Sequence, residues 1–286
     1  MFSWRYRCGT HDLGPIDQPL WRCPDSDLPL ELDGPNDANA IDESATGIRR
    51  YAPLLPVDPD RFVTLGAGMT PLVEGELAGR PVLFKFDALL PTGSFKDRGA
   101  AVAVAHLAAC GIRKVILDSS GNAAAAMAGY AAANDIECIV YAPEAASPGK
   151  LVQARAYVAT VKTVSGSRDD VARAAQGAAR SQTDAFYASH NWSPFFAEGV
   201  KTWALEVWEQ LGRRAPAAVF VPTGGGSALL GAYRGFQATG QVPRIVAAQP
   251  AACAPLVTAL DLDAADIMPA TIGETIAEGA RISNPP

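Results

Sequence analysis

From about residue 80 onward, short apolar runs rich in β-branched residues alternate with alanine-rich stretches. The runs that predict strands are PVLFKFD, KVILDSS, ECIVYAP, VKTVS, AAVFVPT and PRIVAAQ, and helices are predicted at about 96–110, 122–134, 147–158, 167–182, 195–211 and 227–239. This alternation predicts an α/β fold with parallel sheets covered by helices on both faces. In such sheets ligands bind outside the carboxyl ends of the strands, so the turns that follow the strands should carry the chemistry.

Residues 1–50 lack this rhythm and contain many Asp, Pro, Asn and Gly residues, which predicts a loop-rich N-terminal extension. Within it, YRCGTH (6–11) and LWRCPDSDLPL (20–30) each resemble one knuckle of a zinc ribbon, where four Cys or His ligands hold a tetrahedral metal. Each knuckle keeps one cysteine, with His11 available beside Cys8 and only Asp25 or Ser26 near Cys23. We expect a degenerate, zinc-ribbon-like extension that packs without metal, with zinc binding as the alternative.

The composition is that of a soluble globular protein. The chain has 286 residues, 49% hydrophobic and 19% charged, which allows one large domain or two ordinary ones, and we expect two. A net charge of −6 without a basic cluster disfavours nucleic acid as a partner. A charged N-terminus and the absence of about 18 consecutive apolar residues predict a cytoplasmic protein with no membrane association. Five scattered cysteines fit reduced thiols better than disulfides, with Cys110 and Cys138 in the core.

The first turn of chemical interest is LLPTGSFKDRGA, which places Lys96 at the start of a predicted helix. The positive end of the helix dipole and desolvation would both favour the neutral amine of this lysine. A neutral amine can attack an aldehyde and form a Schiff base. The alternative is an exposed lysine after a helix cap at Ser94, with Asp97 and Arg98 as a solvated pair in the first turn.

A second turn, SSGNAAAAMAGYAA (119–132), follows KVILDSS. Ser119, Ser120 and Gly121 form a tight turn, and Asn122 can present its amide to a planar polar ligand. Helix capping alone is the alternative explanation for this turn.

A third turn, GGGSALLGAYRGF (224–236), follows AAVFVPT. Three consecutive glycines leave backbone N–H groups free to bind a phosphate at a helix N-terminus. A nicotinamide-type fingerprint is disfavoured because Leu229 stands where its third glycine belongs, and Gln249 replaces the acid expected after the next strand. A Gly-Lys-Ser/Thr phosphate loop is absent as well.

Taken in order, the three turns resemble those of the fold-type II pyridoxal-phosphate (PLP) enzymes of the tryptophan synthase β superfamily, and within them the threonine synthases. PTGSFKDRG is similar to the lysine motif of that family. Further similar segments are LGAGMTPL (65–72), SSGN, FFAEGVKTWALEVWEQLG (195–212), VPTGGGSALLGAYRGF and TIAEGARISNPP. The resemblance runs from about residue 60 to the end, and the N-terminal extension resembles the knuckle region of some members.

The resemblance implies two doubly wound parallel-sheet domains and the cofactor pyridoxal 5′-phosphate. It implies that Lys96 is the Schiff-base lysine and proton carrier and that Asn122 binds the phenolic oxygen of the cofactor. By the same resemblance, the cofactor phosphate would be held by Gly224, Gly225, Gly226 and Ser227. Candidates for the substrate side are Thr92, Ser94, Ser119 and Asn191. His106 is expected to be a structural histidine, and His190 a structural one near the pocket.

The activity implied is that of a lyase that converts O-phosphohomoserine and water to threonine and phosphate. The alternatives are a related enzyme of β-elimination or β-replacement, such as a threonine or serine dehydratase, and an inactive PLP-binding homologue. Leu90 and Ala67 depart from the Asn and the acid that the family carries in those two motifs, which affects the substrate side. The family continues beyond ISNPP with a segment that supplies a partner for the pyridine nitrogen, and Pro286 is the last residue here.

The domain boundaries expected from these motifs are 1–50 for the extension, 79–184 for the domain with the lysine and Ser-Gly-Asn turns, and 51–78 plus 185–286 for the phosphate domain, incomplete at its C-terminus. An amino acid, phosphorylated in the threonine-synthase case, is the expected substrate. A homodimer is the expected assembly.

Overall fold

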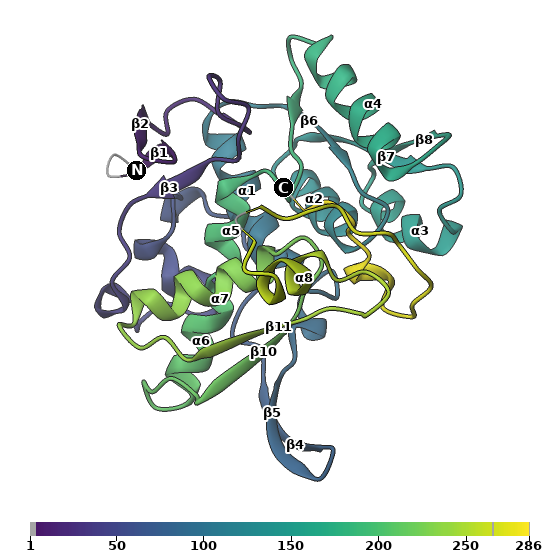
Figure 1. Cartoon of the computed structure of the whole chain (residues 1–286). Coiled ribbons are helices and arrows are strands. Elements are labelled where there is room, and N and C mark those ends of the chain that lie inside the picture. The colour runs from purple at the N-terminus through teal and green to yellow at the C-terminus, as the bar shows by residue number, and fades with distance from the viewer. Residues whose placement is uncertain (1–3, 265, 286) are drawn as a thin grey trace.

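The computed structural model describes residues 4–264 and 266–285. Two parallel sheets lie on either side of a central group of helices, a small antiparallel sheet lies at the N-terminus, and one hairpin protrudes from the body (Figure 1). The predicted α/β class with parallel sheets is confirmed.

The larger parallel sheet has the strand order β8-β7-β6-β9. Its strands are β6 (Lys114–Asp118), β7 (Glu137–Pro143), β8 (Thr160–Val164) and β9 (Phe186–Tyr187), of which the short β9 was not predicted. The sequence KVILD reads as an uninterrupted apolar run because β6 is buried on both faces. Ile116 and Leu117 are fully buried, and each contributes about 1.5–3 kcal/mol of stabilisation.

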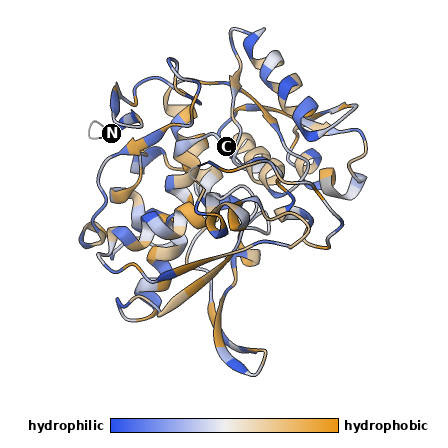
Figure 2. Ribbon diagram, viewed as in Figure 1, coloured by the Kyte–Doolittle hydropathy of each residue, from blue (hydrophilic) through white to orange (hydrophobic). Residues whose placement is uncertain are grey.

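Helices cover both faces of this sheet, as Figure 1 shows. They are α1 (Lys96–Ala109), α2 (Asn122–Ala132), α3 (Pro148–Ala156) and α4 (Arg168–Arg180), each within two residues of the predicted bounds. The amphipathic α4 carries hydrophilic residues on its outer turns, whereas the alanine-rich α2 is apolar throughout and lies in the interior (Figure 2). Small side chains let α2 pack closely against α1 and the sheet.

The second parallel sheet pairs β10 (Ala218–Pro222) with β11 (Arg244–Ala248). It packs against α7 (Ser227–Ala238), and β11 also contacts α8 (Pro255–Asp261), which was not predicted. The single helix predicted at 195–211 is divided into α5 (Pro194–Val200) and α6 (Thr202–Gln210). The hydroxyl of Thr202 donates to the carbonyl of Gly199 at 2.8 Å, a local bond that competes with regular helix hydrogen bonding and bends the chain there.

The prediction of PVLFKFD as a strand of a parallel sheet was wrong. β5 (Arg80–Lys85) pairs with β4 (Leu72–Leu77) as an isolated antiparallel hairpin that protrudes from the body (Figure 1). The two residues of its turn, Ala78 and Gly79, have φ values of +51° and +73°, which suits the twist of a tight hairpin. Alanine is an uncommon residue at the first of these positions, so the sequence carried no recognisable hairpin signal.

The N-terminal extension is not only loops, because β1 (Arg5–Cys8), β2 (His11–Pro15) and β3 (Glu31–Asp33) form a three-stranded antiparallel sheet. Cys8 and Cys23 are buried side by side as free thiols, and the Sγ of Cys8 lies 3.2 Å from the hydroxyl of Ser26. His11 is exposed on β2 and does not join them. In the described part of the chain, no three His, Cys, Asp or Glu residues gather as metal ligands would. No helix among those residues is long and apolar enough to span a membrane.

Short 3₁₀ helices connect these elements. They lie at Ala38–Ala40, Gly47–Leu54, Pro59–Arg61, Asp87–Leu89 and Glu278–Ala280.

Candidate functional site

Lys96 is the first residue of α1, at the carboxyl side of the turn that follows the hairpin. Its side chain is partly buried between two aromatic rings, with Nζ 3.9 Å from the ring centroid of Phe95 and 6.0 Å from that of Phe196. No carboxylate of the described residues forms an ion pair with it. The lysine therefore lies in an apolar environment that does not stabilise its charge.

The charge environment of Lys96 makes its neutral form accessible. Desolvation, followed by the positive charge of Arg168, lowers the pKa of Lys96 to about 7 from an ordinary 10.5. His190 is buried nearby, and desolvation together with the charges of Lys96 and Arg168 holds its pKa well below the usual range. A neutral amine beside a neutral imidazole can act as a nucleophile or as a proton acceptor at pH 7.

The turn before Lys96 is held by internal hydrogen bonds. The backbone N–H and the hydroxyl of Thr92 both donate to Oδ2 of Asp97 at 3.0 Å, and Gly93 adopts a φ of +84°, where glycine is favoured. The buried Ser94 accepts a 3.4 Å bond from the N–H of Lys96. Of the proposed substrate residues, Thr92 thus has its hydroxyl committed to the turn.

The prediction of Asp97 and Arg98 as a solvated pair was wrong, because both side chains are fully buried. The guanidinium of Arg98 pairs with Asp87 at 2.8 Å and with Glu206 at 2.6 Å. Lys85 binds the same Glu206 at 2.6 Å. Each charge in this group has an opposite charge, and these partners come from the hairpin, the following 3₁₀ turn and α6, which lie far apart in the sequence.

The second predicted turn lies at the carboxyl end of β6. The hydroxyl of Ser119 accepts a 3.4 Å bond from the N–H of Gly121, and Asn122 begins α2 with an exposed side chain. Just before them, Asp118 accepts a 2.5 Å bond from the hydroxyl of Tyr187 at the end of β9. Since β6 and β9 are parallel neighbours, their carboxyl ends present this turn and residues 189–191 at the same sheet edge.

The glycine loop begins α7, and Gly226, with a φ of +90°, is the residue before the helix. No side chain among the described residues caps this end, so its backbone N–H groups point outward unpaired. A Cβ on Gly225 would lie 2.8 Å from Oδ1 of Asn191. The loop therefore reaches the segment that holds His190, and His190 in turn is close to Lys96.

These features fit a phosphate-bearing aldehyde. An uncapped helix N-terminus preceded by three glycines can hold the phosphate, and a lysine with a lowered pKa can react with the aldehyde. Lys96, His190, Asn191 and the loop 224–227 come together, whereas Ser119 and Asn122 lie at the neighbouring sheet edge.

Sequence reasoning missed Arg168, which begins α4 after the strand β8. The turn VSGSRDD (164–170) is a fourth strand-to-helix turn at the same edge of the sheet, and that position was the available signal. Its Ser167 and Asp170 form a reciprocal capping box, which fixes the start of the helix and hence the place of Arg168.

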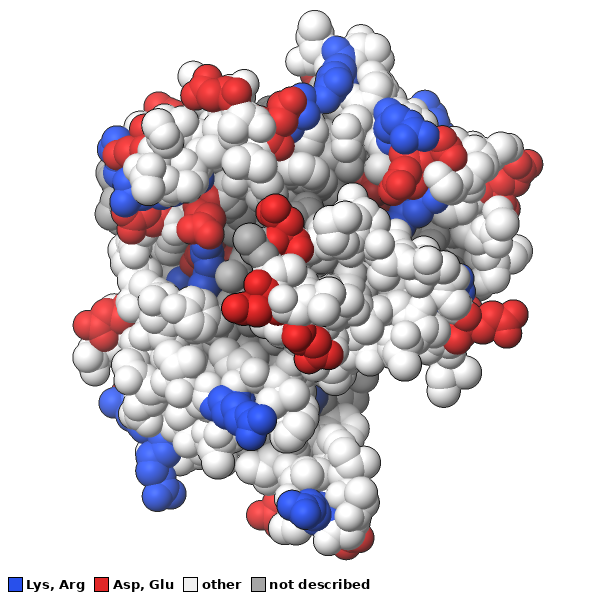
Figure 3. Space-filling view, in the orientation of Figure 1, with Lys and Arg blue, Asp and Glu red and all other residues white. Residues whose placement is uncertain are grey.

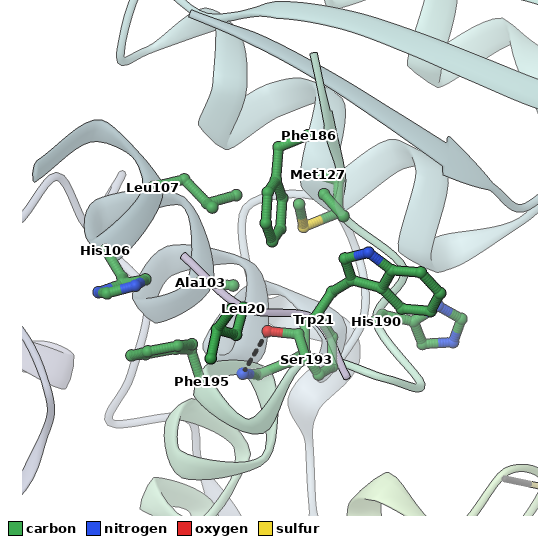
Figure 4. Close-up of a pocket in the computed structure, with 12 residues that line it drawn as sticks. Leu20, Trp21, Ala103, His106, Leu107, Met127, Phe186, His190, Ser193 and Phe195 are labelled. Atoms are coloured by element: carbon green, nitrogen blue, oxygen red, sulfur yellow. Dashed lines mark hydrogen bonds between the residues drawn. The ribbon is translucent and has the colours of Figure 1, made fainter. Parts of the chain in front are cut away.

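The N-terminal extension packs against the other side of α1 and α5, as Figure 4 shows. Leu20 and Trp21 lie beside Phe186 and His190 there, and the Trp21 ring meets that of Tyr187 edge-on at 4.8 Å. His106 is buried and stacks on Phe195 at 3.6 Å, and burial lowers its pKa to about 3. This confirms the expected structural role of His106.

Comparison with known proteins gives a consistent result. Residues 63–286 match the family described as pyridoxal-phosphate dependent enzyme. The chain is 37% identical over 252 residues to the threonine synthase of Methanocaldococcus jannaschii, covering 84% of this chain and 62% of that one. It is 33% identical to the threonine synthase of Methanosarcina acetivorans, with 87% and 64% covered. The chain thus spans less than two thirds of the length of these relatives.

Solved structures give the same fold. A bacterial threonine deaminase, from T.th., matches with a TM-score of 0.66 and 28% identity over 75% of this chain and 70% of that one. Maize serine racemase matches with a TM-score of 0.67 and 25% identity, covering 74% and 65%.

Proposed function

The chain belongs to the family of pyridoxal-phosphate dependent enzymes, and from that premise we propose that it is a lyase of threonine-synthase type. It would convert O-phosphohomoserine and water to threonine and phosphate. The observation that carries this proposal is Lys96, an amine without a counter-charge in an apolar setting, with a pKa lowered to about 7. The relatives named threonine synthase support the choice of reaction.

We propose the following residues for the cofactor. Lys96 would bind its aldehyde carbon, Asn122 its phenolic oxygen, and the backbone of residues 224–227 its phosphate at the positive end of α7. When bound, pyridoxal 5′-phosphate supplies an electron sink for negative charge that develops on the carbon atoms of an amino acid.

The side chains around Lys96 would divide the remaining tasks. Nζ of Lys96 accepts and returns protons, because its two protonation states are close in energy near pH 7. Phe95 and Phe196 keep water away from Nζ. Arg168 gives the substrate side of the site a positive charge, suited to the phosphate of O-phosphohomoserine.

The balanced reaction requires the carbon–oxygen bond to the phosphate to break and a new bond from water oxygen to form at the β-carbon. Proton transfer between neighbouring carbons accompanies these two steps, so a single mobile base within reach of several atoms is sufficient. Lys96, on a flexible stem, meets that requirement, and we also propose Ser94, Ser119 and Asn191 as residues that contact substrate. Thr92 would act indirectly, by fixing the turn through Asp97.

A dehydratase or β-replacement activity is the second candidate, because the structural neighbours include a protein named threonine deaminase. Two separate parallel sheets support the proposed division into residues 79–184 and residues 51–78 plus 185–286. The homodimer and the cytoplasmic location stay predictions.

The test is an assay of the protein with added pyridoxal 5′-phosphate against O-phosphohomoserine, threonine, serine and O-acetylserine. Threonine synthase activity predicts equal amounts of phosphate and threonine from the first substrate and no turnover of the others. Formation of 2-oxo acids and ammonia from threonine or serine, without phosphate release, would favour the dehydratase. Cofactor binding without any turnover would favour the non-catalytic homologue.

Arg168→Ala sharpens this test. It should raise KM for O-phosphohomoserine by about tenfold, a loss of about 1.4 kcal/mol. Arg173→Ala is the matched control, since Arg173 lies on the same helix, is exposed and pairs with Asp170. Equal KM values for the two variants would contradict the proposed role of Arg168.

A further inference from the structure

A second polar cavity lies on the far side of α5 from Lys96. It has a volume of about 340 Å³, within the range of small-molecule sites, and is formed by β3 with its following loop, α5, the start of α6, and α7. Figure 3 shows a hollow between β3 and α7 in which acidic and basic side chains meet. Phe196 and Glu198 are two residues apart on α5, so they point to opposite sides, one toward Lys96 and the other toward this cavity.

The floor of the cavity carries a net positive charge. The side chains of Lys201 and Glu198 are 1% and 3% exposed, and that of Arg234 is 13% exposed. Glu198 is shared by both cations, with Lys201 Nζ at 2.6 Å and an ion pair to Arg234. Two positive charges against one carboxylate leave the floor with an excess of one positive charge.

The two cations have donors to spare. Nζ of Lys201 has three N–H groups, and within the described residues two are used, by Glu198 and by Oδ1 of Asn36 at 3.1 Å. The guanidinium of Arg234 has five N–H groups, of which one bonds to Glu198. Its Nη2 is 3.8 Å from Glu31, too far for a hydrogen bond. A carboxylate on this floor would satisfy donors that the described protein groups do not.

The rim has the opposite charge. Glu31 and Asp33 lie there with side chains 69% and 62% exposed. Tyr233 and Leu230, which are 49% and 40% exposed, give the rim an apolar side, and Trp4 packs beneath Lys201 at 5.2 Å. A simple anion would be repelled at this rim and a simple cation would be repelled at the floor, whereas a molecule with both charges matches both.

We propose that this cavity binds a free α-amino acid, with the carboxylate on Lys201 and Arg234, the ammonium group facing Glu31 and Asp33, and an aliphatic or aromatic side chain against Leu230 and Tyr233. The site is separate from the one assigned to the reaction, and its existence does not depend on which reaction the enzyme performs. Ligands of this size bind such sites with Kd values of about 0.1–1 mM.

Calorimetry on the full chain tests the proposal, with L-leucine, L-methionine, L-threonine and L-phenylalanine as probes. Two forms are compared, the protein without cofactor and the holoprotein after borohydride reduction, in which the first site is blocked. At least one probe should bind both forms with the same Kd. Isocaproate and isoamylamine, which each keep one charge of leucine, should bind at least about tenfold more weakly.

Variants of the rim and floor locate the binding. Glu31→Gln and Asp33→Asn alter exposed side chains and should each weaken binding about threefold or more, and Arg234→Gln should weaken it at least tenfold. Glu43→Gln, at another exposed acid, should leave Kd unchanged. The proposal is overturned if no probe binds up to 10 mM, a limit roughly ten times the upper Kd expected above, if binding needs an unreduced cofactor, or if the two rim variants bind like the wild type.

Discussion

Lys96 and Arg98 are two residues apart on the same helix, yet the structure treats their charges in opposite ways. Arg98 is enclosed by Asp87, Glu206, Thr70 and Thr202, so its buried charge is matched by carboxylates and hydroxyls. Lys96 faces aromatic rings and a second cation. A buried cation with partners holds segments of the fold together, whereas one without partners is held ready to lose its proton and react.

The largest expected effect is on the reaction. Lys96→Ala should lower kcat by at least about 10⁴-fold, because both the covalent attachment and the proton transfer are lost. The folded structure should persist, since Lys96 makes no ion pair within the described residues, and circular dichroism checks this. A variant that keeps a tenth of the activity would contradict the role of Lys96.

The next effect is on stability. Arg98→Met leaves Glu206 and Asp87 buried beside each other with one cation fewer, and should lower the free energy of unfolding by about 3–5 kcal/mol in urea. Adding Glu206→Gln should restore part of that loss. Arg5→Met, which breaks the exposed pair with Asp12, is the control and should cause no resolvable change. Equal destabilisation by Arg98→Met and Arg5→Met would show that the buried group is not structural.

The pH dependence of stability separates the two cations further. In the protein without cofactor, the pKa of Lys96 is about 7, against 10.5 for an ordinary lysine. Between about pH 7 and 10.5 the unfolded chain holds a proton at this position that the folded chain lacks, so Lys96 makes the unfolding free energy rise with pH. Relative to Lys96→Met, the wild type should gain stability across this window. Parallel curves for the two proteins would mean that the lysine is not desolvated.

The smallest effect concerns Arg168. Its charge is the second cause of the lowered pKa of Lys96, after desolvation, so Arg168→Gln should raise that pKa slightly. The rate of acetylation of Lys96 as a function of pH, followed by mass spectrometry, measures the change. A fall in the pKa on this substitution would contradict the assigned proximity.

The two cations also show how far the sequence reaches. The turn PTGSFKDRG, the helix that it begins and the glycine loop could all be identified, because turn chemistry and helix periodicity are local. The pairing of Arg98 with Glu206 could not, because it joins residues 108 positions apart. His190 and Arg168 approach Lys96 only after parallel pairing brings several strand ends to one edge. The hairpin of β4 and β5 was missed because its turn lacks an Asn-Gly or Asp-Gly signal.

The most direct test of the central claim is reductive trapping. The protein is mixed with pyridoxal 5′-phosphate, reduced with borohydride and digested, and the modified lysine is identified by mass spectrometry. The account predicts one modification, on Lys96, that is absent from Lys96→Ala even though Lys85, Lys114 and Lys201 remain. Modification spread over several lysines, or retained in the variant, would contradict the claim that this apolar setting makes Lys96 the reactive amine.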